Sequence, residues 1–210
     1  MTSRPDFGFS PGELRVLRGL RTPAGIQKFL DAMPYHLANT AWSPRRVLAE
    51  RSSHCLEGAI FAAAALRVIG FPPLVMDFEA EKDTDHVIAP FRIGDSWGAL
   101  AKSNYTGCRY REPVYASVRE LAMSYFNDYF NLRGRRSMRT YSRPISLARF
   151  DNRCWMTTDK PVWFVAEMLL EIPHRKVLTA AMIRRLTTVD ARGIAAGLVG
   201  RRRHAPAPGR

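Results

Sequence analysis

Apolar residues in the first fifty positions recur at helical spacing, and two such stretches begin with a hydroxyl residue followed by proline. Thr22 with Pro23, and Ser43 with Pro44, each combine a side chain that caps a helix N-terminus with the residue favoured at the first helical position. After Thr22, apolar residues follow the i, i+3, i+4, i+7 spacing of a buried helix face, at Ile26, Phe29, Leu30 and Met33. The pattern predicts two helices, the first ending at Pro34.

The stretch from Cys55 to Ile69 has the strongest helical character in the chain. It is rich in alanine, and the residues on one side are Leu56, Ala59, Ala63 and Leu66. Gly70 and the Phe-Pro-Pro that follows it end the helix. Because so many alanines permit close approach of neighbouring elements, we expect a central, buried helix rather than a surface one.

Strand signals follow this helix. Residues 74–80 alternate between apolar and polar positions, which is typical of a strand. Residues 85–93 and 96–104 flank the turn sequence Gly94-Asp95 and predict an antiparallel hairpin.

Helical periodicity returns in the second half of the chain. We expect an amphipathic helix over residues 114–130 and helical structure over residues 176–199, while residues 161–171 fit either an apolar strand or a helix. Residues 133–149 carry six arginines and no acidic residue. The order of helices, one central helix, strands and further helices predicts an α+β fold, with an antiparallel sheet packed on the Cys55 helix.

The size of the chain fits one domain. We expect residues 1–200 to form it and residues 201–210 to be a disordered basic tail with nothing to bury. No apolar run approaches the roughly 20 residues that span a bilayer. The N-terminus lacks the apolar segment of a signal peptide, so the expected compartment is the cytoplasm.

Cysteine usage and charge restrict the chemistry. Cys55, Cys108 and Cys154 are far apart and lack CxxC spacing, which argues for free thiols rather than a disulfide framework or a four-ligand zinc site. The net charge of +13 arises mainly from arginine and favours polyanions as partners. No motif for reading DNA or RNA accompanies it, so a solvated basic face is the preferred interpretation, and nucleic acid is not an expected partner.

Cys55 is the best candidate for a nucleophile. A thiol in the first turn of a helix lies near unpaired N–H groups and the positive end of the dipole, which lower its pKa and can hold an oxyanion. The general base is expected to be His86, which opens a strand. The other histidines are less suitable, because His36 and His174 lie close to prolines, His204 lies in the tail and His54 points away from its neighbour Cys55.

A third group must orient the imidazole. A two-residue hairpin loop would pair His86 with Ser103, and a three-residue or bulged loop would pair it with Asn104. We favour Asn104, because an amide accepts the imidazole N–H better than a hydroxyl does. Trp97 is expected near the site through its strand. Asp83 and Asp85 with His86 do not indicate a metal site, because adjacent strand residues point to opposite faces.

Two segments of the sequence resemble a known superfamily. "HCLEGAIFAAAALRVIGFPPLV" is similar to the nucleophile helix of the transglutaminase-like superfamily, and "DHVIAPFRIGDSWGALAKSN" to its histidine strand, turn and tryptophan strand. The resemblance covers about residues 43–106, with "KSNYTGCRYREPVY" and "YSRPISLARFD" similar to an uncharacterised bacterial branch. It implies a papain-like fold with Cys55 as nucleophile and His86 as base. At the third position the superfamily usually has Asp followed by Pro, where this chain has Ser103 and Asn104.

The sequence therefore predicts a thiol-dependent acyl-transfer enzyme that needs no cofactor or metal. Its substrate would be a peptide or protein, and the acyl group would pass to water or to an amine. The alternative is a non-catalytic module of the same fold that binds a peptide or protein partner. An arginine-driven nucleic-acid binder is the third reading. The sequence does not indicate an oligomeric state.

Overall fold

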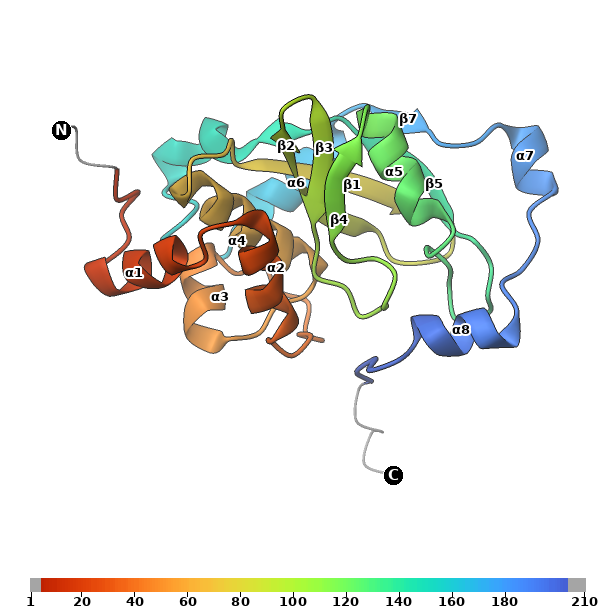
Figure 1. Cartoon of the computed structure of the whole chain (residues 1–210), viewed down its shortest axis with the longest axis horizontal. Coiled ribbons are helices and arrows are strands. Elements are labelled where there is room, and N and C mark those ends of the chain that lie inside the picture. The colour runs from red at the N-terminus through yellow and green to blue at the C-terminus, as the bar shows by residue number, and fades with distance from the viewer. Residues whose placement is uncertain (1–4, 204–210) are drawn as a thin grey trace.

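The computed structural model describes residues 5–203. Its helices are α1 (Pro11–Gly19), α2 (Pro23–Asp31), α3 (Pro44–Glu50), α4 (Cys55–Val68), α5 (Val118–Phe126), the 3-10 helix η1 (Leu147–Arg153), α6 (Trp163–Glu171), α7 (Ala180–Arg184) and α8 (Ala191–Gly197). Its strands are β1 (Leu74–Ala80), β2 (His86–Ile93), β3 (Ser96–Leu100), β4 (Arg111–Tyr115), β5 (Met138–Ser142), β6 (Ile145–Ser146) and β7 (His174–Lys176). In Figure 1, α1 to α4 gather at one end, the sheet crosses the middle, and α7 and α8 lie at the other end.

Within the described residues the strands form one sheet of seven strands in the order β4-β3-β2-β1-β5-β7, with β6 paired to β1. Every strand pair is antiparallel. The predicted α+β class and antiparallel sheet are therefore confirmed. No helix of the described chain has the length and apolar character needed to cross a bilayer.

The predicted helix starts at Thr22 and Ser43 are confirmed. The Thr22 hydroxyl accepts a hydrogen bond from the Gly25 N–H, and the Ser43 hydroxyl accepts one from the Arg46 N–H. These caps satisfy backbone donors that the first turn leaves unpaired. Together they fix where α2 and α3 begin and thus how both helices meet α4.

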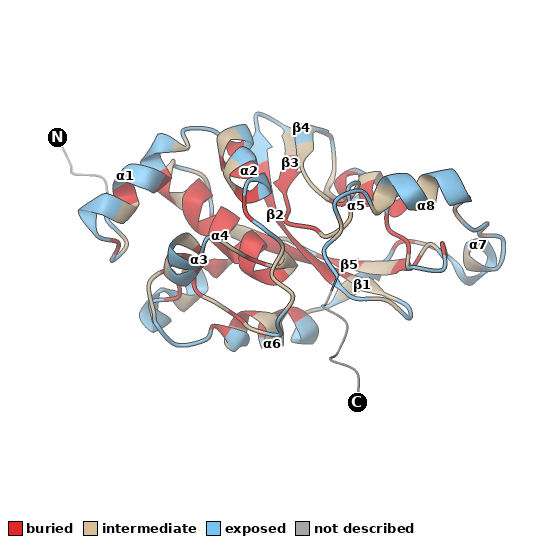
Figure 2. Ribbon diagram, turned by 90° about the horizontal axis from the view of Figure 1, so that it is seen from below, coloured by how far each residue is buried: buried red, intermediate tan, exposed pale blue. Residues whose placement is uncertain are grey.

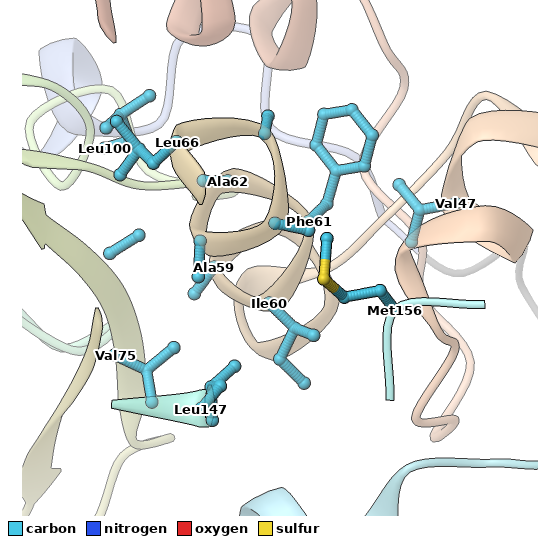
Figure 3. Close-up of a cluster of buried hydrophobic side chains, with 14 of the residues drawn as sticks. Val47, Ala59, Ile60, Phe61, Ala62, Leu66, Val75, Leu100, Leu147 and Met156 are labelled. Atoms are coloured by element: carbon cyan, nitrogen blue, oxygen red, sulfur yellow. The ribbon is translucent and has the colours of Figure 1, made fainter. Parts of the chain in front are cut away.

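Helix α4 is the centre of the molecule, as its alanine content predicts. Its fully buried residues include Ala59, Ile60, Phe61, Ala62, Ala63, Ala64, Ala65 and Leu66. Figure 2 shows it buried among the other helices and the sheet, and Figure 3 shows its side chains meeting residues of α3, β1 and β3. Small side chains let α4 lie close to β2 and β1.

The sheet has an apolar cluster on each face. Val75, Val87 and Ala89 face α4, while Phe78 and Ile88, on the same strands, belong to a second cluster with α5. This alternation follows from the period of two along a strand. His86 lies on the α5 face, because it is two residues from Ile88.

Two predicted helices are wrong in extent. The expected helix over residues 114–130 begins as the edge strand β4, and α5 starts only after its cap, Ser117. The residues 176–199 contain the end of β7 and two short helices instead of one helix. Proline is tolerated at position 113 because β4 is an edge strand, where no further strand requires the N–H that proline lacks. The ambiguous residues 161–171 include the helix α6.

The predicted hairpin is confirmed and its turn is the tight one. Ile93 pairs with Ser96, so only Gly94 and Asp95 form the loop. Gly94 has φ +57°, a conformation that glycine adopts without a Cβ clash and that a two-residue hairpin turn requires.

Candidate functional site

A pocket opens where the start of α4, the start of β2 and the loop after β3 meet. Its volume is about 220 Å³. Cys55 and His86 both line it, and so do Ser103 and Asn104. The fold therefore brings the predicted catalytic residues Cys55, His86 and Asn104 to one cavity.

Cys55 is the first residue of α4 and lies at the wall of this pocket. Its thiol donates a weak hydrogen bond to the Asp85 carbonyl, with 3.9 Å between sulfur and oxygen. Asp85 precedes β2, so the sulfur lies against the beginning of that strand. The position at a helix N-terminus matches the sequence prediction.

The protonation state of Cys55 differs from the prediction. Burial raises the pKa of the thiol above its usual value, and the nearby Asp77 carboxylate adds to the rise. Hydrogen bonds from the Val87 and Leu56 N–H groups and from Tyr35 act in the opposite direction on this pKa without overcoming it. The resting group is therefore a protonated thiol, because loss of water outweighs the helix N-terminus.

Tyr35 is a site residue that sequence reasoning missed. Burial raises the pKa of its phenol, so the group remains a protonated donor beside Cys55. Tyr35 belongs to the loop between α2 and α3, and its chain pairs with Ser53 in an isolated parallel bridge. No sequence pattern links a tyrosine in a loop to a cysteine twenty residues later.

His86 lies in an aromatic environment on the α5 face of the sheet. Its ring is within 6.5 Å, between ring centres, of Phe78, Tyr125 and Tyr129. This burial, with a smaller contribution from the Arg111 charge, lowers the pKa of His86 to about 4. The imidazole is therefore neutral at pH 7 and can act as a proton acceptor.

A backbone carbonyl fixes the tautomer of His86. Its Nε2 lies 3.1 Å from the Cys108 carbonyl oxygen. Because a carbonyl can only accept, Nε2 carries the hydrogen and the lone pair is on Nδ1. The Cys108 main chain thus makes the contact that we expected of Asn104, while its buried thiol donates to the Asp128 carbonyl at 3.5 Å and the residue lines the same pocket.

The predicted contact between Asn104 and His86 is wrong. The two-residue turn sets a register that, continued past the last paired residue of β3, places Ser103 opposite His86. Asn104 instead binds the backbone of Arg202 through both its amide atoms. The Ser103 hydroxyl accepts from the Tyr105 N–H at 3.0 Å, and the described residues include no hydrogen bond between Ser103 and His86.

The expectation for Trp97 is also wrong. Trp97 lies beside the hairpin turn, at the opposite end of β3 from the pocket, and pairs with Arg92 and Tyr115. The Arg92 guanidinium covers its ring at 5.2 Å from the ring centre. Membership of the hairpin strand therefore did not bring this residue near Cys55.

No hydrogen bond joins Cys55 to His86 in the part of the chain that the structure describes. The two residues approach the pocket from different directions, because Cys55 comes from α4 and His86 points toward α5. Both side chains nevertheless line the same pocket.

Glu57 anchors the loop that carries Tyr35. It is completely buried in α4. One carboxylate oxygen accepts from the Thr40 hydroxyl at 2.5 Å and the Trp42 N–H at 3.1 Å, and the other accepts from the His54 N–H and lies 3.1 Å from His36 Nδ1. Four partners surround one carboxylate, which ties residues 36–42 to the start of α4.

His36, His54 and Glu57 together have the composition of a metal site. The atoms that would bind a metal ion already make hydrogen bonds, however. His54 Nε2 lies 2.8 Å from the Thr40 carbonyl and must donate to it, so this nitrogen has no lone pair for a metal ion. The cluster is a hydrogen-bond network that joins residues 36–42 to the start of α4.

No protein-family model matches the chain, and no curated protein matches its sequence.

Proposed function

We propose that the chain is a thiol-dependent acyl-transfer enzyme with a transglutaminase-like (papain-like) fold, and that Cys55 is its nucleophile. One observation carries the proposal. The Cys55 thiol lies at the N-terminus of a buried helix, in the same pocket as a neutral histidine whose Nε2–H is already held by a carbonyl. The free lone pair on Nδ1 is what a general base requires.

The reaction would begin when a substrate carbonyl enters the pocket. The Cys55 sulfur forms a bond to the carbonyl carbon while its proton passes to His86 Nδ1. The carbonyl oxygen becomes an oxyanion, for which the N–H groups of Leu56 and Val87 and the Tyr35 hydroxyl, already close to the sulfur, are suitable donors. The C–N or C–O bond then breaks, His86 returns the proton to the leaving group, and a thioester remains.

The thioester would pass its acyl group to water or to an amine. Water gives a peptidase or amidase, and an amine gives a transferase. In either case His86 takes a proton from the acceptor and returns it to the Cys55 sulfur as the thioester bond breaks. The resemblance to transglutaminase-like proteins, in the order helix cysteine and then hairpin histidine, supports both outcomes equally.

Hydrolysis of p-nitrophenyl acetate, followed with and without added hydroxylamine, tests the proposal. We expect a measurable rate that Cys55→Ala abolishes, whereas Cys154→Ala, which removes the exposed thiol, leaves it unchanged. Acetyl hydroxamate formed at the expense of acetate would show that the thioester accepts an amine-type nucleophile. A rate that is the same in Cys55→Ala would refute the role of Cys55.

A second candidate function is a peptide-binding module without turnover. It is favoured by the raised pKa of Cys55 and by the absence of a Cys55–His86 hydrogen bond among the described residues. Under this reading, peptides bind equally well to Cys55→Ala and no ester is hydrolysed. If the unaltered chain hydrolyses no ester and forms no covalent adduct, the peptide-binding function is the correct one.

A further inference from the structure

The last described residues pass directly beside the Cys55 pocket. We call residues 198–203 the C-terminal strap. In Figure 1 the chain turns back between α7 and α8 and continues after α8 toward the end of the molecule that holds α1 to α4. Arg201 lines the pocket, and Arg202 contacts both Asn104 and the Tyr35 carbonyl. The prediction that the tail is disordered is therefore wrong for residues 201–203, and its residues 204–210 lie outside the described chain.

Asn104 holds the strap by its main chain. The Asn104 Nδ2 donates to the Arg202 carbonyl at 2.9 Å, and the Arg202 N–H donates to Asn104 Oδ1 at 2.8 Å. This is the pair of hydrogen bonds that neighbouring antiparallel strands exchange, made here by one side-chain amide. This pair uses only the main chain of Arg202, whose guanidinium donates separately to the Tyr35 carbonyl at 3.3 Å.

Thr106 contacts the main chain where α8 ends and the strap begins. Its N–H donates to the Gly197 carbonyl at 3.0 Å, and its hydroxyl lies within 3.3 Å of the Val199 carbonyl. These carbonyls, with that of Ala196 at 3.0 Å from the hydroxyl, belong to the end of α8 and the turn after it, so Thr106 fixes where the strap begins, and among the described residues Asn104 alone makes the paired main-chain bonds to the strap. This is how peptides are recognised by strand addition, in which main-chain bonds give affinity.

The strap itself fits the pocket imperfectly. The Nε–H of Arg201 is buried without a hydrogen-bond partner. An unsatisfied buried donor has a free-energy cost of about 1–3 kcal/mol. A peptide that placed an uncharged residue or an acceptor at this point would avoid the cost, so the strap is displaceable.

We propose that Asn104 is a main-chain recognition residue for extended peptides that enter the Cys55 pocket, and that the C-terminal strap occupies this site within the same chain. The identity of such a peptide as a substrate rests on the proposed function, but its binding does not. Because a tethered segment acts at an effective concentration in the millimolar range, a free peptide competes poorly with it.

Peptide binding tests the proposal in the full-length chain. The probe is a fluorescein-labelled peptide Ala-Gly-Leu-Val-Gly-Arg-Arg-Arg, the sequence of residues 196–203, and binding is measured by fluorescence anisotropy at fixed salt. In Arg202→Pro the chain lacks the N–H that donates to Asn104, which frees the site. We expect this variant to bind the probe at least about tenfold more tightly than the unaltered chain.

Two variants make the test specific to Asn104. Adding Asn104→Ala to Arg202→Pro should return binding to the weak level, whereas adding Asn39→Ala, at an exposed asparagine elsewhere, should not. A probe with proline at the Arg202 position should also bind weakly. Equal affinity for all chains, including no binding to any of them, would overturn the proposal.

A further variant separates peptide binding at Asn104 from catalysis by Cys55. Cys55→Ala combined with Arg202→Pro should retain tight probe binding, because recognition does not use the thiol. If the chain binds the probe but hydrolyses no ester, the proposed peptide site is supported and the catalytic role of Cys55 is refuted.

Discussion

Among single residues, His86 shows how far a residue type alone determines a role. The sequence identified the histidine that reaches the pocket but assigned its orienting partner to a side chain. The structure gives that role to the Cys108 carbonyl, 3.1 Å from Nε2. Every residue has a carbonyl, so no sequence pattern distinguishes the one that will accept this hydrogen bond.

The buried imidazole should make stability depend on pH. His86 has a pKa of about 4 in the folded chain and 6.5 as an ordinary histidine. Below pH 6.5 the unfolded chain therefore binds a proton that the folded chain does not, and the free energy of unfolding decreases by up to about 3 kcal/mol as the pH falls to 4. Urea unfolding between about pH 7 and pH 4.5 measures this loss.

His86→Phe provides the comparison for that measurement. Phenylalanine suits the aromatic surroundings and does not titrate, so the variant should lose less stability over the same pH range. Cys55→Ala retains His86 and should behave as the unaltered chain does. Equal losses in the unaltered chain and in His86→Phe would show that other groups dominate this interval.

The corrected register leads to a second prediction for single residues. Asn104→Ala should not lower kcat for ester hydrolysis, because Asn104 binds Arg202 and the imidazole is held by Cys108. Ser103→Ala should likewise leave kcat nearly unchanged, since its hydroxyl binds a neighbouring N–H. A decrease of about tenfold or more in Asn104→Ala, with the fold intact, would restore Asn104 as the orienting residue.

Secondary-structure elements were predicted best where local chemistry determines them. Thr22 and Ser43 cap helices where expected, and the alanine-rich helix is as central as its composition indicated. The errors came from weak local signals, such as the arginine-to-tyrosine segment 111–115 that became an edge strand. Such a strand depends on its neighbour β3 more than on its own sequence.

Close packing at Gly58 provides a test of how α4 is placed. A Cβ at this position would overlap the Cβ of Lys102. Lys102 cannot move away easily, because its ammonium group donates to the Leu30 carbonyl at 2.7 Å and to the Met33 carbonyl at 2.5 Å. Gly58→Ala should therefore destabilise the chain by about 1–3 kcal/mol in urea unfolding, despite the better helix propensity of alanine.

Gly12→Ala is the matched control for this prediction. Gly12 also lies in a helix, but a Cβ there would meet no atom within 4 Å. This variant should be neutral or stabilise by up to about 1 kcal/mol. If Gly58→Ala were equally harmless, the tight contact between α4 and the loop after β3 would be contradicted.

For the whole molecule, the sheet order and the pocket depend on contacts between distant parts of the chain. The sequence indicated the β2–β3 hairpin, but nothing local predicted that β1 would pair with β5, or that Tyr35 would meet Cys55. The arginines illustrate the same limit. Several bind acids within the fold, such as Arg45 with Glu13 and Arg139 with Glu81, so net charge alone does not define a binding surface.

Trapping the acyl-enzyme tests the central claim most directly. The chain is mixed briefly with p-nitrophenyl acetate at about pH 7, quenched in acid, digested and mapped by mass spectrometry. We predict acetyl transfer to Cys55, slowed about a hundredfold or more in His86→Ala, whereas any acetylation of the exposed Cys154 is the same in both chains. Acetylation of Cys154 without Cys55, or the same Cys55 rate in His86→Ala, would contradict the account.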